Sequence, residues 1–134
     1  MKEERNHYVV IKPNEKVQVI EKDISTIDTH DLLRKTVEGY IECVALQDDI
    51  DIWLNEEGKL IGLEPSLALV KNGEIVDLLM GNLLVAGRDD EGETISLTID
   101  QLETFGKLIE DDGGTVVITL ANGEKRNLPY IEIV

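Results

Sequence analysis

The residues most able to do chemistry in this sequence are clustered carboxylates. Asp48, Asp49 and Asp51 form one cluster, and the run Asp89-Asp90-Glu91-Gly92-Glu93 forms another. Hard cations such as Ca²⁺ and Mg²⁺ bind clustered carboxylate oxygens. However, the second run lacks the distal glutamate of a calcium-binding helix-loop-helix, and the first leads directly into a predicted strand. We therefore expect a solvated, charged turn at each place, with no metal site and no cofactor.

Other catalytic arrangements are not indicated. A serine or cysteine nucleophile needs a neighbouring base, yet the two histidines lie near no Gly-x-Ser-x-Gly elbow, which is absent. Cys43 alternates with Ile41 and Ala45, which predicts a small core residue rather than a reactive thiolate. The glycines match neither the dinucleotide-binding nor the Lys-Ser/Thr phosphate-loop pattern. Paired carboxylates such as Asp49 and Asp51 lack a recognisable partner set, so we expect a protein that is not an enzyme.

The distribution of charge is more informative. The 134 residues include 28 acidic and 13 basic side chains, which gives a net charge of −15. No lysine or arginine occurs from Thr36 to Gly58 or from Asp89 to Gly106. Such blocks repel nucleic-acid phosphate and anionic lipid, so we expect no direct binding to nucleic acid or membrane. They attract a cationic groove, as a mimic of nucleic acid would, although acids that only keep the protein soluble remain an alternative.

The acidic blocks and one tryptophan supply the candidate partner-binding residues. Strand alternation places Trp53 with Asp51 on the face opposite Ile50, Ile52 and Leu54. An exposed tryptophan among acids could anchor an interface, but a helix could equally cover it. The predicted partner-binding set is Asp48, Asp49, Asp51, Trp53, Asn55, Glu56, Glu57, Asp89, Asp90, Glu91 and Glu93.

A small-ligand site is the alternative interpretation. It would lie near Asn55, Gly58, Asp77 and Gly81, because glycine lets backbone amides approach a phosphate group. The lack of basic residues near these positions in the sequence argues against an anionic ligand.

The elements that must position these residues follow from periodicity and turn signals. The first half of the chain predicts a hairpin, then a helix that begins at Asp28 or Thr29 and ends at a left-handed Gly39, and then two strands. In residue numbers, the expected elements are a hairpin of His7–Lys12 and Lys16–Glu21, a helix up to residue 39, and strands at Tyr40–Leu46 and Ile50–Leu54.

The second half predicts shorter elements and one clear hairpin. Pro65 suits the first position of a short helix that ends at Asn72-Gly73, and Thr98 with Gln101 forms a capping-box pattern. The expected elements are a short strand at Lys59–Leu63, a helix over Pro65–Val70, two strands or one bent strand over Ile75–Arg88, a strand at Ile95–Leu97, a helix from Thr98 with Ile99, Leu102, Phe105 and Ile109 facing inward, a hairpin of Thr115–Leu120 and Glu124–Leu128, and a last strand at Tyr130–Val134.

Together these elements predict an α+β fold with a mainly antiparallel sheet and two to three packed helices, in a single compact domain. Residues 1–97 form the core, and the helix and hairpin of residues 98–134 are expected to belong to the same domain. The single cysteine, the absence of an apolar run of about 20 residues, and a start without a signal-peptide core favour a cytoplasmic location. The apolar last strand, as a sheet edge, could pair with its copy in a homodimer.

Three motifs carry a family resemblance. They are Val37-Glu38-Gly39-Tyr40-Ile41-Glu42, then Asn55 to Leu63, then Asp77 to Gly81 with Leu83 to Gly87. In order and spacing, the chain resembles a family catalogued as domain of unknown function 3846, over roughly Tyr8 to Leu97. It differs from the usual family form where a second glycine often precedes Gly39, because Glu38 stands there, and where Thr98 onward adds a helix and strands.

The resemblance implies a context rather than a reaction. Such proteins are small and cytosolic, and belong to phages, plasmids and conjugative elements of Gram-positive bacteria, where small acidic proteins often act against host defence. We therefore expect a non-enzymatic inhibitor that occupies the nucleic-acid-binding groove of a host nuclease, either a restriction enzyme or a CRISPR effector. The alternative is a protein that binds, and thereby sequesters, a nucleotide signal.

Overall fold

The computed structural model describes residues 5–23, 29–110 and 115–133, which contain ten strands and two helices. Along the chain these elements are β1 (Arg5–Ile11), β2 (Gln18–Asp23), α1 (Thr29–Val37), β3 (Ile41–Ala45), β4 (Ile50–Asn55), β5 (Pro65–Lys71), β6 (Glu74–Met80), β7 (Leu83–Arg88), β8 (Thr94–Ile95), α2 (Ile99–Glu110), β9 (Thr115–Thr119) and β10 (Lys125–Glu132).

The strands form two sheets. Sheet A has the order β2-β1-β7-β4-β3, with β8 paired to β7, and all its pairs are antiparallel. Sheet B has the order β6-β5-β10-β9, and its β5–β10 pair is parallel. The predicted α+β fold with mainly antiparallel pairing is therefore confirmed, with two helices in the described residues and with the strands divided between two sheets.

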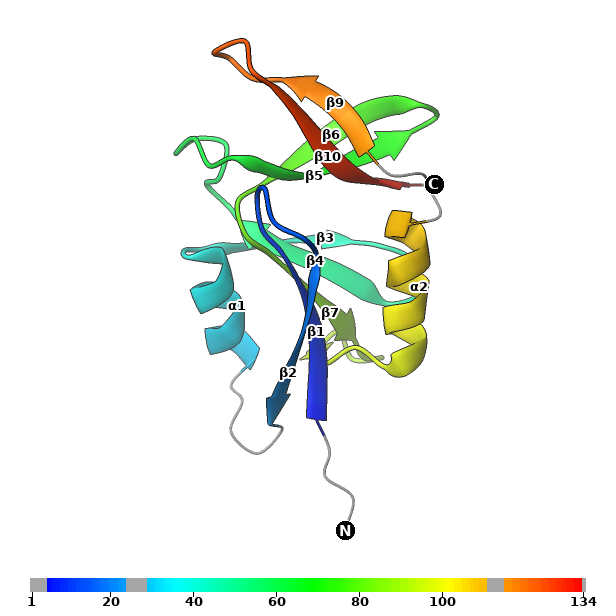
Figure 1. The fold of residues 1–134 in the computed structure, drawn as a ribbon. Coiled ribbons are helices and arrows are strands. Elements are labelled where there is room, and N and C mark those ends of the chain that lie inside the picture. Colours follow the sequence, from blue (N-terminus) through cyan, green and yellow to red (C-terminus); the bar gives the residue numbers. More distant parts are fainter. Residues whose placement is uncertain (1–4, 24–28, 111–114, 134) are drawn as a thin grey trace.

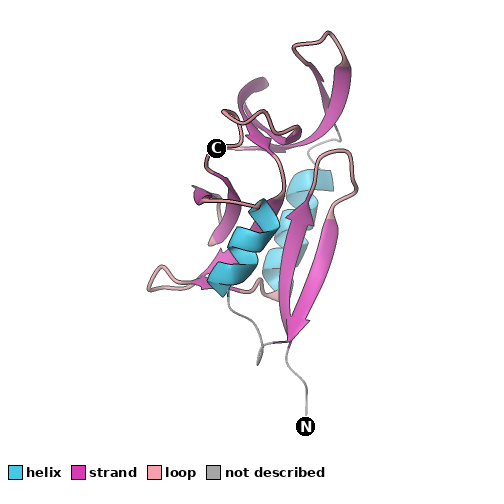
Figure 2. Ribbon diagram, turned by 90° about the vertical axis from the view of Figure 1, so that its left-hand side faces the viewer, coloured by secondary structure: helices cyan, strands magenta, loops and turns pink. Residues whose placement is uncertain are grey.

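The two helices lie on opposite sides of sheet A, and sheet B lies against one end of it (Figure 1). On one face of sheet A, Leu33 of α1 packs with Tyr8, Val10, Leu84 and Ala86. The other face packs against sheet B and α2 in a larger cluster that contains Ile50, Ile52, Leu54, Val85, Leu67, Leu69, Leu79, Phe105 and Ile131. The view in Figure 2, turned by 90°, shows the helices and the β1–β2 hairpin of this arrangement. Sheet A is thus the middle layer.

Several local predictions are confirmed. β1 and β2 form the expected hairpin, with Val9 opposite Val19. The capping box at α2 is complete, because the backbone N–H of Thr98 donates to Oε1 of Gln101 at 3.0 Å and the backbone N–H of Gln101 donates to Oγ1 of Thr98 at 3.1 Å. Phe105 is buried in the larger cluster as expected. Ile99 is not, since it is 61% exposed.

The predicted helix over Pro65–Val70 is wrong, because these residues form strand β5. β5 lies between β6 and β10 in sheet B, where its apolar run is buried on both faces. Proline is tolerated as the first residue of a strand. Asn72 and Gly73, with φ values of 52° and 80°, form the tight turn between β5 and β6 that an Asn-Gly pair favours. The predicted short strand at Lys59–Leu63 is likewise wrong, because residues 56–62 form turns.

The end of α1 also differs from the prediction. The left-handed residue is Glu38, with φ of 61°, rather than Gly39. Gly39 is required for another reason, because a β carbon at this position would lie 2.7 Å from Nδ2 of Asn55. Asn55 approaches closely because this amide donates to the carbonyl oxygen of Val37 at 3.2 Å. The residue expected to start the helix, Asp28, lies outside the described residues.

The C-terminal strand lies between β5 and β9 in sheet B. β10 is one continuous strand rather than two, and pairs with β9 through its first half and with β5 through Tyr130 to Glu132. Tyr130 to Glu132 pair with β5 on one side, and no described strand pairs with their other side, so the homodimer expected through this strand stays a prediction. Val134, like the segment 111–114 after α2, lies outside the described residues.

Candidate functional site

Two acidic runs that are distant in sequence meet at one end of sheet A. The β4–β7 pairing sets Asp51 opposite Ala86, so the turn of residues 47–49 lies beside the turn of residues 89–93. The start of α2 joins them, because Nε2 of Gln101 donates to the carbonyl oxygens of Asp48 at 3.0 Å and Asp49 at 3.1 Å. We define the acidic end as the exposed carboxylates Asp48, Asp49, Asp90, Glu91, Glu93 and Asp100.

Both turns are held by hydrogen bonds of their own. Asp48 and Asp49 each have φ of 58°, the left-handed conformation that aspartate tolerates better than most residues. Oδ1 of Asp89 accepts hydrogen bonds from the backbone N–H groups of Glu91 at 2.9 Å and Glu93 at 2.8 Å. Asp89 therefore shapes the turn, while the neighbouring side chains project their charges from it.

Asp51 has a different role from the other acids. It is 3% exposed, and its carboxylate forms an ion pair with Nη1 of Arg88. Nη2 of Arg88 also lies 3.2 Å from Oδ1 of Asp49. The charge of Asp51 is the largest cause of the raised pKa of Arg88. Asp51 thus neutralises the arginine and does not present a free negative charge.

Trp53 lies on the α1 side of sheet A, opposite Ile52 and Leu54, as the alternation predicted. It packs against the cluster that contains Leu33 of α1, so a helix covers part of this face. Its indole nitrogen Nε1 is buried and has no hydrogen-bond partner among the described residues. Trp53 is therefore only partly available to a partner protein.

Asn55, Glu56 and Glu57 lie at the opposite end of β4 from the acidic end. Glu56 follows Asp51 by five positions along the chain, a span of about 17 Å in an extended strand. Asn55 is buried and structural, because it also accepts a hydrogen bond from the N–H of Glu57 at 2.8 Å. Glu56 and Glu57 are exposed. The predicted partner-binding residues thus form two groups and not one patch.

The residues of the small-ligand alternative are partly brought together. Asn55 and Asp77 line a pocket of about 300 Å³, together with Glu42, Glu56 and Lys59. Nζ of Lys59 lies 2.5 Å from Oδ1 of Asp77, so the lysine is already paired. The acids outnumber the single cation, and this favours a cationic ligand group over a phosphate.

The two glycines of this alternative donate their amides within the protein. The N–H of Gly58 donates to the carbonyl oxygen of Asn55 at 3.1 Å, and the N–H of Gly81 donates to that of Glu64 at 2.7 Å. Neither amide is therefore available to cradle a phosphate group.

The motif residues that carry the family resemblance meet around this pocket. The N–H of Glu56 donates to the carbonyl oxygen of Tyr40 at 2.9 Å, and a β carbon at Gly58 would lie 3.2 Å from Cβ of Met80. The family described as Domain of unknown function (DUF3846) matches residues 6–110. The chain belongs to the DUF3846 family. The family motifs lie at the end of α1, in residues 55–63, and around the link between β6 and β7.

The DUF3846 match runs from β1 through α2, further than the resemblance to Leu97 that the motifs supported. It includes sheet A apart from Arg5, both described helices, and strands β5 and β6 of sheet B, and it leaves β9 and β10 outside. No curated protein and no solved structure matches this DUF3846 protein.

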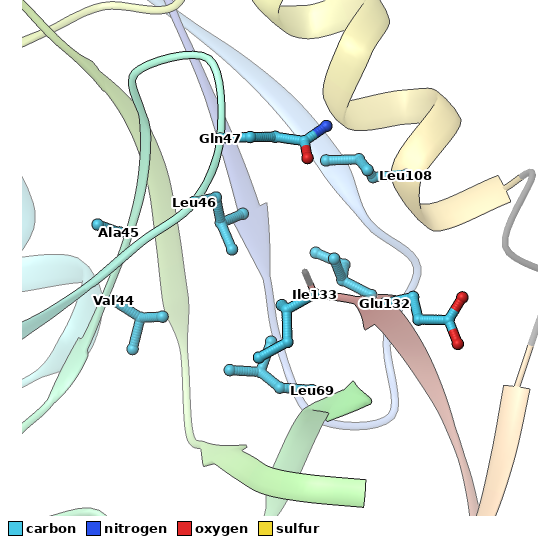
Figure 3. A pocket seen from close by; sticks show the side chains of 9 residues that line it. Val44, Ala45, Leu46, Gln47, Leu69, Leu108, Glu132 and Ile133 are labelled. Atoms are coloured by element: carbon cyan, nitrogen blue, oxygen red, sulfur yellow. The ribbon is translucent and has the colours of Figure 1, made fainter. Parts of the chain in front are cut away.

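An apolar cavity of about 230 Å³ was not predicted from the sequence of this DUF3846 protein. It lies between β3, α2 and sheet B, and its lining includes Leu46, Leu69, Leu108 and Ile133 (Figure 3). One signal for this cavity was present in the sequence. In the predicted strand Tyr40–Leu46, the apolar residues Val44 and Leu46 lie on the same face and alternate with the residues of the opposite face.

Cys43 was predicted to be a core residue, which is wrong, because it is exposed on the outermost strand of sheet A. The error arose because β3 pairs with a single strand, β4, among the described residues. Burial of the thiol is nevertheless the largest of the causes that raise its pKa from 9.0 to about 11, and the charge and hydrogen bond of Asp51 raise it further. The thiol is therefore protonated at neutral pH.

Within residues 5–23, 29–110 and 115–133, no group of three or more histidine, cysteine or acidic side chains is placed to hold a metal ion. Neither helix of this part of the chain has the length and apolar character that a membrane crossing requires.

Proposed function

We propose that this DUF3846 protein is a non-enzymatic inhibitor, carried by a mobile element of Gram-positive bacteria, whose acidic end occupies the nucleic-acid-binding groove of a host defence nuclease. The target is a restriction enzyme or a CRISPR effector. The observation that carries this proposal is the meeting of three acidic segments at one end of sheet A, through the β4–β7 pairing and the contacts of Gln101.

The charge arrangement suits this role. Arg88 is the cation that contacts this end among the described residues, and its guanidinium is bound by Asp49 and Asp51. The remaining carboxylates are exposed and unopposed by any lysine or arginine between residues 89 and 106. A groove that binds nucleic acid does so mainly through cations that contact phosphate, and these cations attract a rigid array of carboxylates by the same long-range force.

The experiment is capture of the target from a cytosolic lysate of a Gram-positive host that carries restriction and CRISPR systems. The immobilised protein is loaded at low salt and eluted with rising salt, and the eluted proteins are identified by mass spectrometry. We expect a nuclease that elutes as salt rises, since salt screens attraction between exposed charges. The purified nuclease should then be inhibited by the protein.

A matched pair of variants tests which surface acts. Asp90→Lys, Glu91→Lys and Glu93→Lys change the acidic end, while Glu15→Lys, Glu21→Lys and Glu74→Lys change the net charge equally at exposed positions elsewhere. The first triple variant should lose capture and inhibition, and the second should keep both. Equal effects of the two triple variants would refute a specific role for the acidic end.

The small-ligand alternative is supported by the pocket that Asn55 and Asp77 line. A panel of cyclic and linear nucleotides, tested by thermal shift, separates it from the inhibitor function. A clear rise in the melting temperature with one nucleotide would favour a protein that sequesters a signal. A flat response across the panel would remove this alternative, as the occupied glycine amides lead us to expect.

A further inference from the structure

Strand β3 is an edge strand with free backbone groups. It pairs with β4 on one side, and no other described strand pairs with it. Neither proline nor lysine, which commonly protect sheet edges, occurs in β3. The strand is therefore able to accept another strand.

The hydrogen-bond pattern shows which backbone groups are free. The N–H of Leu46 donates to the carbonyl oxygen of Ile50 at 2.8 Å, and beyond the other end of β3 Glu56 donates to Tyr40. Because the groups of an antiparallel strand alternate in direction, the N–H and C=O groups of alternate residues in this register face away from β4. These residues are Ile41, Cys43 and Ala45.

The side of β3 that faces sheet B is lined by a two-part groove. The apolar cavity of about 230 Å³ and the acidic pocket of about 300 Å³ both include Val44 in their linings, so they meet at the middle of the strand. Leu46 and Leu69 line the apolar part, which Figure 3 shows. Glu42, Glu56 and Asp77 line the acidic part, and Lys59 is the one cation among the described residues that line it.

We propose that the edge of β3 binds an extended segment of a partner protein by strand addition. Main-chain groups of the segment pair with Cys43 and Ala45, and its alternate side chains lie over the groove. A side chain opposite Leu46 enters the apolar cavity and is aliphatic. A side chain opposite Glu42, four residues away in the segment, is lysine or arginine.

Charge complementarity selects this occupant. Glu42 and Glu56 are exposed at the acidic part, Glu132 lines the apolar part, and Lys59 is already paired with Asp77. A second copy of this acidic chain would bring like charges together, whereas a cationic segment is attracted. The inference shares one assumption with the proposed function, namely that the partner is a protein with a basic surface.

The test is selection of binders from a displayed library of random ten-residue peptides against the full chain, followed by measurement of each binder's Kd. We expect the selected peptides to share an aliphatic residue and a basic residue four positions apart. Ala45→Pro removes an outward N–H at an edge, where proline is tolerated, and should weaken binding at least tenfold. Ala45→Ser keeps this N–H and should leave the Kd within twofold.

A second variant protects the test against misfolding. Glu42→Lys changes an exposed side chain and should also weaken binding of the basic peptides at least tenfold. The proposal is overturned if no peptide is enriched, or if the enriched peptides bind Ala45→Pro and Glu42→Lys as they bind the unchanged chain. The two proposals can fail separately. If the triple variant Asp90→Lys, Glu91→Lys and Glu93→Lys still captures the nuclease, the acidic-end function is contradicted. If the selected peptides still bind in the expected way, the β3 inference stands.

Discussion

Arg88, the last residue of β7, forms an ion pair with Asp51 of β4, whose side chain is 4% exposed. Removal of the guanidinium would leave a buried carboxylate without its counter-charge, which is strongly unfavourable. We therefore expect Arg88→Met to lower the urea concentration at the midpoint of unfolding. Arg34→Met, at an exposed position of α1, is the control and should leave the midpoint unchanged. Equal midpoints for the two variants would show that the pair contributes nothing to stability.

Phe105 joins α2 to the larger core cluster and is 2% exposed. Phe105→Ala should lower the free energy of unfolding by about 3–5 kcal/mol, the usual cost of removing a buried aromatic side chain. Ile99→Ala on the same helix changes a side chain that is 61% exposed and should have an effect within about 0.5 kcal/mol.

The same variant tests whether residues 98–134 belong with residues 1–97. The fluorescence of Trp53 reports on sheet A, and far-UV circular dichroism reports on the whole fold. In the unchanged protein and in Phe105→Ala alike, the two signals should follow one shared unfolding transition. If Phe105→Ala changed the circular dichroism transition and left the Trp53 transition unmoved, the C-terminal helix and hairpin would form a separate unit.

Substitutions at two adjacent positions at the end of α1 should have opposite effects on the free energy of unfolding. Glu38 is left-handed, so Glu38→Gly should stabilise the protein by about 1 kcal/mol. At Gly39 an added β carbon would meet Nδ2 of Asn55 at 2.7 Å, so Gly39→Ala should destabilise by about 1–3 kcal/mol. Urea unfolding measures both. Stabilisation by Gly39→Ala would mean that Asn55 can move away at no cost.

Alkaline pH should weaken the fold through Cys43. Its pKa is raised from 9.0 to about 11 in the folded protein, so this stabilisation is fully present below pH 9 and is lost as the pH rises through about 11. The buried Tyr8 hydroxyl, whose pKa is also raised, acts in the same direction above pH 10. The free energy of unfolding, measured from pH 8 to pH 11, should therefore fall.

Reaction with iodoacetamide isolates the cysteine. The rate at Cys43 should be low at neutral pH and reach half its maximum near pH 11, because the thiolate is the reactive form. Cys43→Ser should show a shallower loss of stability with pH, leaving the contribution of Tyr8. A half-maximal rate near pH 8 would contradict the raised pKa.

The sequence correctly predicted those elements whose residues form hydrogen bonds with one another within a few positions. The capping box of Thr98 and Gln101 is such a case, since both hydrogen bonds lie within three residues. The run after Pro65 was assigned to a helix because proline also begins helices and a short apolar run fits both structures. Its partners β6 and β10 made it a strand, and β10 follows more than fifty residues later.

Residue types and their order along the chain were enough to predict the net charge, the two acidic blocks free of lysine and arginine, the α+β character and the hairpins, because these depend on composition and on neighbouring residues. Which acids lie side by side depends on the folded arrangement of the strands. The β4–β7 pairing brings the turn at Asp48 beside the turn at Asp90, sets Glu56 and Glu57 at the far end, and buries Asp51 against Arg88. These relationships arise from pairing between distant strands, which no local pattern specifies.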